Sequence, residues 1–164
     1  MNEQVNFRIG TGYDIHRLEV GRPLILGGIE IPFEKGLVGH SDADAVSHAV
    51  CDALLGAAAL GDIGQHFPDT DPNYRGVSSL KFLERVLTLL KESNYQINNI
   101  DITIHAERPK LQNFKNAIKE KLAETLKISL TQINIKGKTN EGLDSVGRGE
   151  AIAVSAIALI YQTK

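Results

Sequence analysis

The stretch GEAIAVSAIALIYQ, Gly149–Gln162, decides the fold of this protein. From Ala151 to Ile160 it carries no charge, and its apolar residues do not alternate with polar ones. We expect a strand that is apolar on both faces, and such a strand must be covered on both faces. Three helices predicted elsewhere in the chain can cover one face, and a subunit interface is a natural cover for the other.

The elements predicted around this strand follow from the spacing of apolar residues. Leucines between residues 80 and 90 recur at helical spacing, whereas Ile100, Ile102 and Ile104 alternate as in a strand. This order of elements predicts an α+β fold with helices packed on one face of a sheet. The predicted elements are a strand over Phe7–His16, a hairpin turning at Gly27-Gly28, a helix over Ser41–Ala59, a helix over Ser78–Ser93, a strand over Ile97–Glu107, a helix over Leu111–Lys127, a strand over Gln132–Asn140 and the strand over Gly149–Gln162.

Length and composition indicate the class of protein. The chain has 164 residues, and we expect one domain over residues 1–164. The net charge of −2 and the low aromatic content without Trp do not favour nucleic acid or an anionic membrane as a partner. The single Cys51 fits a reducing compartment, the first residues MNEQVNFRIG lack the pattern of a secretory signal, and the run AIAVSAIALI is too short to span a bilayer. We therefore expect a cytoplasmic protein.

The segment GYDIH, Gly12–His16, suggests a metal site. Asp14 and His16 stand two residues apart and project from the same face of the predicted strand. His48, inside the first predicted helix, can add a second imidazole, and two nitrogens with one carboxylate form the pattern of a catalytic zinc site. Taken singly, each of these residues also fits a hydrogen-bonded or surface role, and Cys51, one turn after His48, is either a further ligand or a core residue.

His40 stands just before this helix, where free backbone N–H groups suit an anion such as phosphate. Ser41 or Asp42 is the expected N-cap. The loop that follows the helix, GDIGQHFPDTDPNYRG, is about 16 residues long, which in a compact domain hints at function. Its aspartates also fit ordinary turns.

Two further segments combine residues that suit phosphate. KGKTNEGLDSVGRGE, Lys136–Glu150, mixes cations, hydroxyls and glycines, so it fits either a phosphate-holding loop or a glycine-rich hairpin. HAERPKLQ, His105–Gln112, places Pro109 and Lys110 at a helix start, which is an ordinary N-terminus or a phosphate or base contact.

Four segments, in order, closely resemble the 2-C-methyl-D-erythritol 2,4-cyclodiphosphate synthase family: GYDIH, GHSDADAVSHAVCDALLGAAALGDIGQHFPDTDP, AERPKL and KTNEGLDSVGRGEAIA. The resemblance covers the chain from about Arg8 to Ala158. It implies a two-layer α+β sandwich with a mixed, mainly antiparallel sheet and helices on one face. It further implies a homotrimer in which the sheets pack around a threefold axis and the active sites lie between subunits.

The resemblance also implies an activity. Members of this family close 4-diphosphocytidyl-2-C-methyl-D-erythritol 2-phosphate into a cyclic diphosphate and release CMP, a step of the non-mevalonate route to isoprenoid precursors. The 2-phosphate of the substrate attacks its own β-phosphorus, so no protein nucleophile is needed. The implied cofactors are zinc and a second divalent cation, magnesium or manganese, and some members hold an isoprenoid diphosphate on the trimer axis.

The resemblance assigns roles to matching positions of this chain. Asp14, His16 and His48 match the zinc ligands, and Glu141 matches the ligand of the second divalent ion. His40 and Thr139 match the residues that stabilise the transition state, and this pair is the catalytic set that we expect. The residues that it places against the substrate are Asp14, Ile15, His16, His40, Ser41, Asp62, Ile63, Gly64, Phe67, Pro68, Asp69, Thr70, Asp71, Ala106, Glu107, Arg108, Pro109, Lys110, Leu111, Gln112, Lys138, Thr139, Asn140, Glu141 and Arg148.

The chain departs from some members at two places. Gly137-Lys138 stands where they have an alanine-threonine pair, and Ser145 stands where they have an aromatic residue. Two other functions also fit the motifs: a zinc-dependent phosphoesterase using metal-bound water, and a non-catalytic trimer that binds a nucleotide or an isoprenoid diphosphate. The products, or their absence, distinguish the three.

Overall fold

The computed structural model describes residues 6–163, and its largest element is a five-stranded sheet in the order β4-β1-β7-β5-β6. The central strand is β7, which corresponds to the stretch predicted to be apolar on both faces. β5 and β6 pair in parallel, and the other neighbours pair antiparallel, so the sheet is mixed and mainly antiparallel. Its strands are β1 (Phe7–Val20), β4 (Lys35–Leu37), β5 (Tyr95–His105), β6 (Ile133–Lys138) and β7 (Ala151–Gln162).

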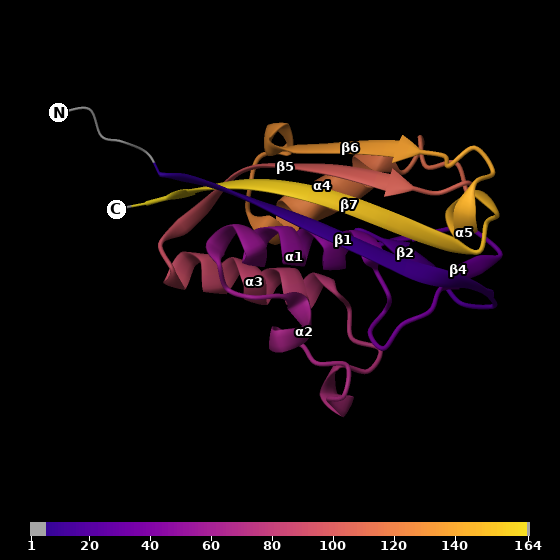
Figure 1. Ribbon diagram of the computed structural model, residues 1–164, viewed down its shortest axis with the longest axis horizontal. Helices are drawn as coiled ribbons and strands as arrows, with labels where there is room; N and C mark the ends of the chain where they lie inside the picture. The colour runs from indigo at the N-terminus through magenta and orange to yellow at the C-terminus, as the bar shows by residue number, and fades with distance from the viewer. Residues whose placement is uncertain (1–5, 164) are drawn as a thin grey trace.

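Three helices cover one face of this sheet, as the order of elements predicted (Figure 1). α1 (Ala45–Ala58) packs on β1 and β7, α4 (Lys115–Leu126) packs on β6, and α3 (Leu80–Glu92) lies against both helices and β5. None of the helices in the described residues is long and apolar enough to cross a membrane. The smaller elements are the hairpin of β2 (Leu24–Leu26) and β3 (Ile29–Ile31), α2 (Ile63–His66), η1 (Pro72–Tyr74), η2 (Leu130–Gln132) and α5 (Asp144–Gly147).

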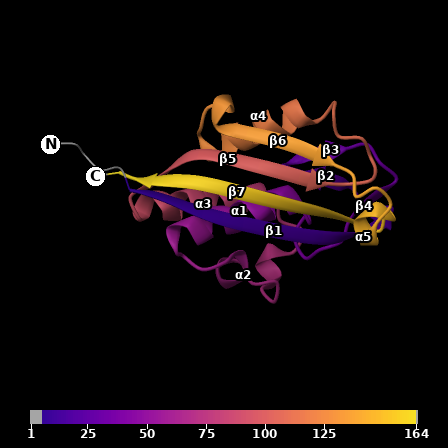
Figure 2. The ribbon, with the colours of Figure 1, turned by 45° about the horizontal axis from the view of Figure 1, so that its top comes forward.

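The opposite face of the sheet is open along most of its length (Figure 2). Among residues 6–163, cover on this face is limited to its end near α5, where Val146 packs with Ala151 and Ala153. Apolar side chains elsewhere on this face are exposed, among them Ile9 at 67% and Tyr13 at 58%. An apolar surface of this kind indicates an interaction site.

Several predicted boundaries were wrong. β1 continues past His16 to Val20 because its last residues pair with β4, a short strand that was not predicted. The third predicted helix begins at Lys115 rather than Leu111. The loop over residues 61–76 contains two short helices, α2 and η1, and the Lys136–Glu150 segment contains α5 rather than a simple hairpin turn.

The predicted N-cap of the first helix was also wrong. The helix begins at Ala45, and its cap is Asp44 rather than Ser41 or Asp42. The Asp44 carboxylate is fully buried and accepts the N–H groups of Val46 and Ser47 and the Ser47 hydroxyl. It also accepts the N–H groups of Gly27 and Gly28 in the β2–β3 turn, both of which have positive φ. Asp44 is the N-cap, rather than Ser41 or Asp42, because its carboxylate accepts N–H groups of the first helical turn and also binds the β2–β3 hairpin.

Two glycines on β1 decide how closely α1 approaches the sheet. A Cβ atom on Gly12 would lie 1.9 Å from the carbonyl oxygen of Ala49, and one on Gly10 would lie 2.1 Å from that of Ala53. The contacting atoms on α1 belong to its backbone, which cannot rotate away as a side chain can. α1 therefore packs directly on the backbone of β1, and one point of closest approach is Gly12, which is two residues before Asp14.

Candidate metal centre and adjoining pockets

Asp14, His16 and His48 meet at one point between β1 and α1. Nε2 of His16 and Nδ1 of His48 each lie 2.9 Å from Oδ2 of Asp14. The two ring nitrogens are 3.2 Å apart. The structure thus brings together the three residues that were expected to share a cation.

The hydrogen-bonding pattern of the two imidazoles fits a metal ion. Nδ1 of His16 lies 2.7 Å from the carbonyl oxygen of Val38, which can only accept, so Nδ1 carries the proton and a neutral ring has its lone pair on Nε2. Nε2 of His48 lies 2.9 Å from the hydroxyl oxygen of Ser79 and 3.1 Å from that of Ser41, which leaves Nδ1 for the shared point. Two lone pairs and a carboxylate oxygen repel one another unless a proton or a cation lies between them, and this donor set is one that zinc accepts.

The charges at the shared point perturb each other. Burial acts to raise the pKa of Asp14, but its hydrogen bonds to His16 and His48 outweigh this effect and hold that pKa well below the usual range. Burial acts to lower the pKa of His16, but the hydrogen bond and negative charge of Asp14 outweigh it and raise the pKa above 6.5. In the absence of a metal ion, the two shifts stabilise an ion pair between the Asp14 carboxylate and the protonated His16 ring.

This ion pair makes metal uptake dependent on pH. We expect zinc affinity to increase by up to about tenfold per pH unit until pH passes the raised pKa of His16, and then to level off, because a bound cation must displace the His16 proton. The stability of the metal-free protein should change in the opposite sense, since the contribution of His16 is complete below 6.5 and is lost as pH rises through its raised pKa. Chelator competition would measure the zinc affinity, and urea unfolding the stability of the metal-free protein, at pH values from below 6.5 to above the raised pKa of His16. A zinc affinity that falls with rising pH would contradict the assignment.

Residues that sequence analysis did not select support the two imidazoles. Val38 accepts from His16, and Ser79 lies against His48 although the two are 31 residues apart in the chain. Ser79 in turn donates its hydroxyl to Asp42. Ser79 precedes α3 and Asp42 precedes α1, where serine and aspartate are ordinary capping residues. Their sequence positions therefore gave no indication that they lie beside the metal centre.

A cavity of about 580 Å³ opens beside the metal centre. His16 and His48 form part of its wall, and the stacked rings of Phe67 and Phe82, with centroids 4.4 Å apart, form another part together with Tyr74. The residues expected to contact the substrate that line it are His16, His40, Ser41, Ile63, Gly64, Phe67, Pro68, Asp69 and Thr70.

Asp62 and Asp71, which were also expected at the substrate, stabilise the conformation of the loop over residues 61–76. Asp62 caps α2 by accepting the N–H of Gln65, and Asp71 caps η1 by accepting that of Asn73. The carbonyl oxygen of Asp71 also accepts from Nε2 of His40 at 3.0 Å. His40 is therefore tied to the loop that borders the cavity. Ile15, also expected at the substrate, alternates with Asp14 and His16 on β1 and is 43% exposed, so its side chain lies on the other side of the sheet.

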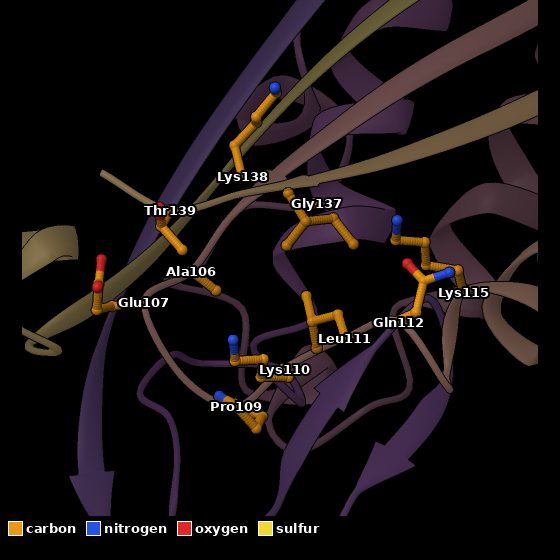
Figure 3. A pocket seen from close by; sticks show the side chains of 11 residues that line it. Ala106, Glu107, Pro109, Lys110, Leu111, Gln112, Lys115, Gly137, Lys138 and Thr139 are labelled. Atoms are coloured by element: carbon orange, nitrogen blue, oxygen red, sulfur yellow. The ribbon is translucent and has the colours of Figure 1, made fainter. Parts of the chain in front are cut away.

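A second pocket of about 170 Å³ lies where β5 and β6 end (Figure 3). Three lysines contribute to its lining, and Oε2 of Glu107 is buried without a hydrogen-bond partner among the described residues. The pocket therefore suits a phosphorylated ligand that also carries a hydrogen-bond donor. The lining residues are Ile104, Ala106, Glu107, Pro109, Lys110, Leu111, Gln112, Lys115, Gly137, Lys138 and Thr139.

Four other residues expected at the substrate do not line this pocket: Arg108, Asn140, Glu141 and Arg148. Glu141 adjoins it, because its carboxylate accepts the Thr139 hydroxyl at 2.7 Å. Asn140 donates to Asp144 at the start of α5. Arg148 makes a bidentate ion pair with Glu150. Arg108, next to Pro109, is exposed.

The α+β fold, a candidate metal site of two histidines and one carboxylate, and a separate basic pocket together fit the class of metal-dependent proteins that act on phosphorylated small molecules. The chain matches the YgbB family over residues 7–161 and belongs to that family. It is 57% identical, over 155 residues, to the 2-C-methyl-D-erythritol 2,4-cyclodiphosphate synthase of Clostridium perfringens, an alignment that covers 94% of this chain and 99% of that one.

Solved structures resemble the chain in fold as well. The bifunctional IspDF of Campylobacter jejuni superposes with a TM-score of 0.94 at 37% identity, covering 98% of this chain but only 44% of that longer one. The IspF of Plasmodium falciparum, solved as a CDP complex, superposes with a TM-score of 0.86 at 35% identity and covers 99% of this chain and all of that one.

Proposed function

We propose that the protein converts 4-diphosphocytidyl-2-C-methyl-D-erythritol 2-phosphate to 2-C-methyl-D-erythritol 2,4-cyclodiphosphate and CMP. The observation that carries this proposal is the identity of 57% along 99% of a relative that bears the name of this cyclase. In this reaction an oxygen of the 2-phosphate bonds to the β-phosphorus, and the bond from the β-phosphorus to the oxygen bridging it to the α-phosphate breaks. CMP leaves with that oxygen, so water takes no part.

The residues of the chain suit a reaction that needs alignment rather than a protein nucleophile. Asp14, His16 and His48 would hold zinc, and Glu141 would hold magnesium or manganese; these cations would supply charge that orients the diphosphate and offsets the charge of the leaving CMP. His40 borders the cavity beside the metal centre; because its Nε2 donates to the Asp71 carbonyl, a protonated Nδ1 is the group that would bind a phosphate oxygen. The loop from Phe67 to Asp71 would cover the methylerythritol part and exclude water.

The second pocket is proposed to bind the cytidine diphosphate part. Lys110 and Lys115 contribute positive charge to it, whereas the Lys138 side chain points away from its centre (Figure 3), and Thr139 lies on its edge. The IspF of Plasmodium falciparum was solved with CDP, a ligand that shares the cytidine and diphosphate groups of this substrate. Gly137 leaves the pocket wall open, and Lys138 adds a cation where some members of the family have threonine.

We further propose a homotrimer with active sites between subunits. Within one chain β7 and β5 separate β1 from β6, so the metal centre and the second pocket lie about three strand spacings, or roughly 14 Å, apart across the sheet. Joining the two halves across a subunit boundary would bring them together, and packing the open sheet faces around a threefold axis would cover Ile9, Tyr13 and Ile157. We also propose that an isoprenoid diphosphate can bind on that axis, near Arg148.

Mixing two inactive variants tests the shared site. We expect His48→Ala and Thr139→Ala proteins to be inactive alone but to regain activity after subunits are exchanged, because one interface in a mixed trimer can combine two intact halves. With random mixing about a quarter of the sites would be intact. A mixture that stays inactive, although mass spectrometry detects mixed trimers, would place each site within a single chain.

The reaction itself is tested with zinc-loaded protein and the cytidyl substrate, followed by phosphorus NMR. The cyclic diphosphate and CMP should appear together. Linear phosphates containing oxygen from labelled water would instead show a zinc phosphoesterase. Tight binding without turnover would show a non-catalytic binding protein.

A further inference from the structure

We propose that Ser79 and Asp42 are positioning residues of the metal centre, acting through His48. They would hold the His48 ring in the tautomer and the orientation that direct its Nδ1 lone pair toward Asp14 and His16. This inference rests on the proposed use of a cation at this centre. It adds two residues that neither the motifs of the sequence nor the pockets identify.

A continuous chain of hydrogen bonds leads from His48 to Asp42. Nε2 of His48 lies 2.9 Å from the hydroxyl oxygen of Ser79, and the hydroxyl of Ser79 donates to Oδ1 of Asp42. The backbone N–H of Ser79 donates to Oδ2 of the same carboxylate at 3.0 Å. Ser79 is fully buried, so water does not compete for these bonds.

The protons in this chain can be assigned. The Asp42 carboxylate can only accept, so the Ser79 hydroxyl proton points toward it and the Ser79 oxygen is free to accept. One lone pair of that oxygen faces Nε2 of His48 at 2.9 Å. The hydroxyl oxygen of Ser41 lies 3.2 Å from the Ser79 oxygen and 3.1 Å from the same Nε2, so Ser41 can donate its proton to Ser79 and present a lone pair to Nε2 as a second, more distant acceptor. His48 therefore carries its proton on Nε2, and a neutral ring has its lone pair on Nδ1, which faces the shared point.

The position of Ser79 supports a role other than helix capping. It precedes α3 as the N-cap residue, where a serine normally accepts an N–H from the first turn. Its side chain makes no such capping bond and turns to His48 and Asp42 instead. The hydroxyl is thus used at the metal centre at the expense of the helix that it precedes.

The same arrangement occurs on the other imidazole, where the Val38 carbonyl accepts from Nδ1 of His16. Each ligand ring is thus held by an acceptor that is not itself a ligand. For His48 the acceptor is a hydroxyl made more basic by a carboxylate behind it. Such outer hydrogen bonds typically alter metal affinity by about 10- to 100-fold.

The test measures metal affinity in the full-length protein. Ser79→Ala should weaken binding of Zn²⁺ and of Co²⁺, determined by chelator competition, by about 10- to 100-fold. It should also shift the visible absorption bands of bound Co²⁺, since the His48 ring is free to rotate or change tautomer. Asp42→Ala should change both quantities in the same direction. Ser78→Ala is the matched control: Ser78 directly precedes Ser79 but takes no part in the hydrogen bonds that join His48, Ser79 and Asp42, so this variant should leave both unchanged.

A Ser79→Ala protein that folds and binds both ions as tightly as the wild type, with the same Co²⁺ spectrum, would overturn the proposal, even if its stability were lower. Wild-type affinity in Asp42→Ala would remove Asp42 from it. A wild-type protein that binds neither ion would overturn the metal assignment as well, so the two failures can be told apart.

A measurement on the wild-type protein covers the case in which the variants do not fold. Co²⁺-loaded protein in water should show two slowly exchanging, paramagnetically shifted ring N–H protons in its NMR spectrum, one from His16 and one from His48. A single such proton would show that His48 does not donate to a buried acceptor, and would overturn the proposal.

Discussion

Replacing His48 with alanine should lower the rate of cyclisation by about a thousandfold or more and abolish stoichiometric zinc binding. Nδ1 of His48 is one of three ligand atoms at the shared point, and without it Asp14 and His16 would have to hold the ion alone. A thousandfold loss corresponds to about 4 kcal/mol of transition-state stabilisation, a reasonable amount for a charge placed beside a transferring phosphoryl group.

The loss should be local, because His48 is only partly buried and lies on the cavity side of α1. Zinc content, circular dichroism and the phosphorus NMR assay would separate loss of the ion from loss of the fold. Cys51→Ala is the matched control. Cys51 lies one turn further along the same helix and is fully buried, away from the shared point, so this variant should retain zinc and activity. One zinc ion per chain in His48→Ala would contradict the ligand assignment.

Replacing Gly12 with alanine should reduce the free energy of unfolding by about 3 kcal/mol and weaken metal binding together with it. The new Cβ would lie 1.9 Å from the Ala49 carbonyl oxygen, so α1 and β1 must move apart. Ala49 follows His48 directly, and Asp14 lies two residues after Gly12. The movement that relieves the clash therefore separates ligands on the two elements.

Gly56→Ala, on the same helix, should have the opposite effect on stability. A Cβ at Gly56 would have only the Thr11 carbonyl oxygen nearby, at 3.9 Å, and alanine is favoured over glycine within a helix by about 1 kcal/mol. Urea unfolding of the metal-free proteins and chelator competition would measure both variants. A Gly12→Ala protein with the stability and zinc affinity of the wild type would show that the close approach does not hold the ligands together.

Much of the fold could be predicted because local periodicity reports burial. β7 was expected to need cover on both faces and lies at the centre of the sheet. The errors occurred where a distant partner decided the outcome. β1 is longer than predicted because it pairs with β4, and the first helix starts at Ala45 because Asp44 also binds the turn at Gly27 and Gly28.

The sequence by itself determined the α+β class, the shared direction of Asp14 and His16, and the candidates for a third ligand, because the periods of strands and helices depend only on local backbone geometry. Only the tertiary structure decided that His48 meets the pair through Nδ1 and that Ser79 and Asp42 are hydrogen-bonded in a chain behind the His48 ring. These facts depend on the distance between α1 and β1, which two glycines reduce, and on contacts between residues more than 30 positions apart. Such contacts leave no periodic signal in the chain, since any residue of suitable chemistry at either position would give the same local pattern.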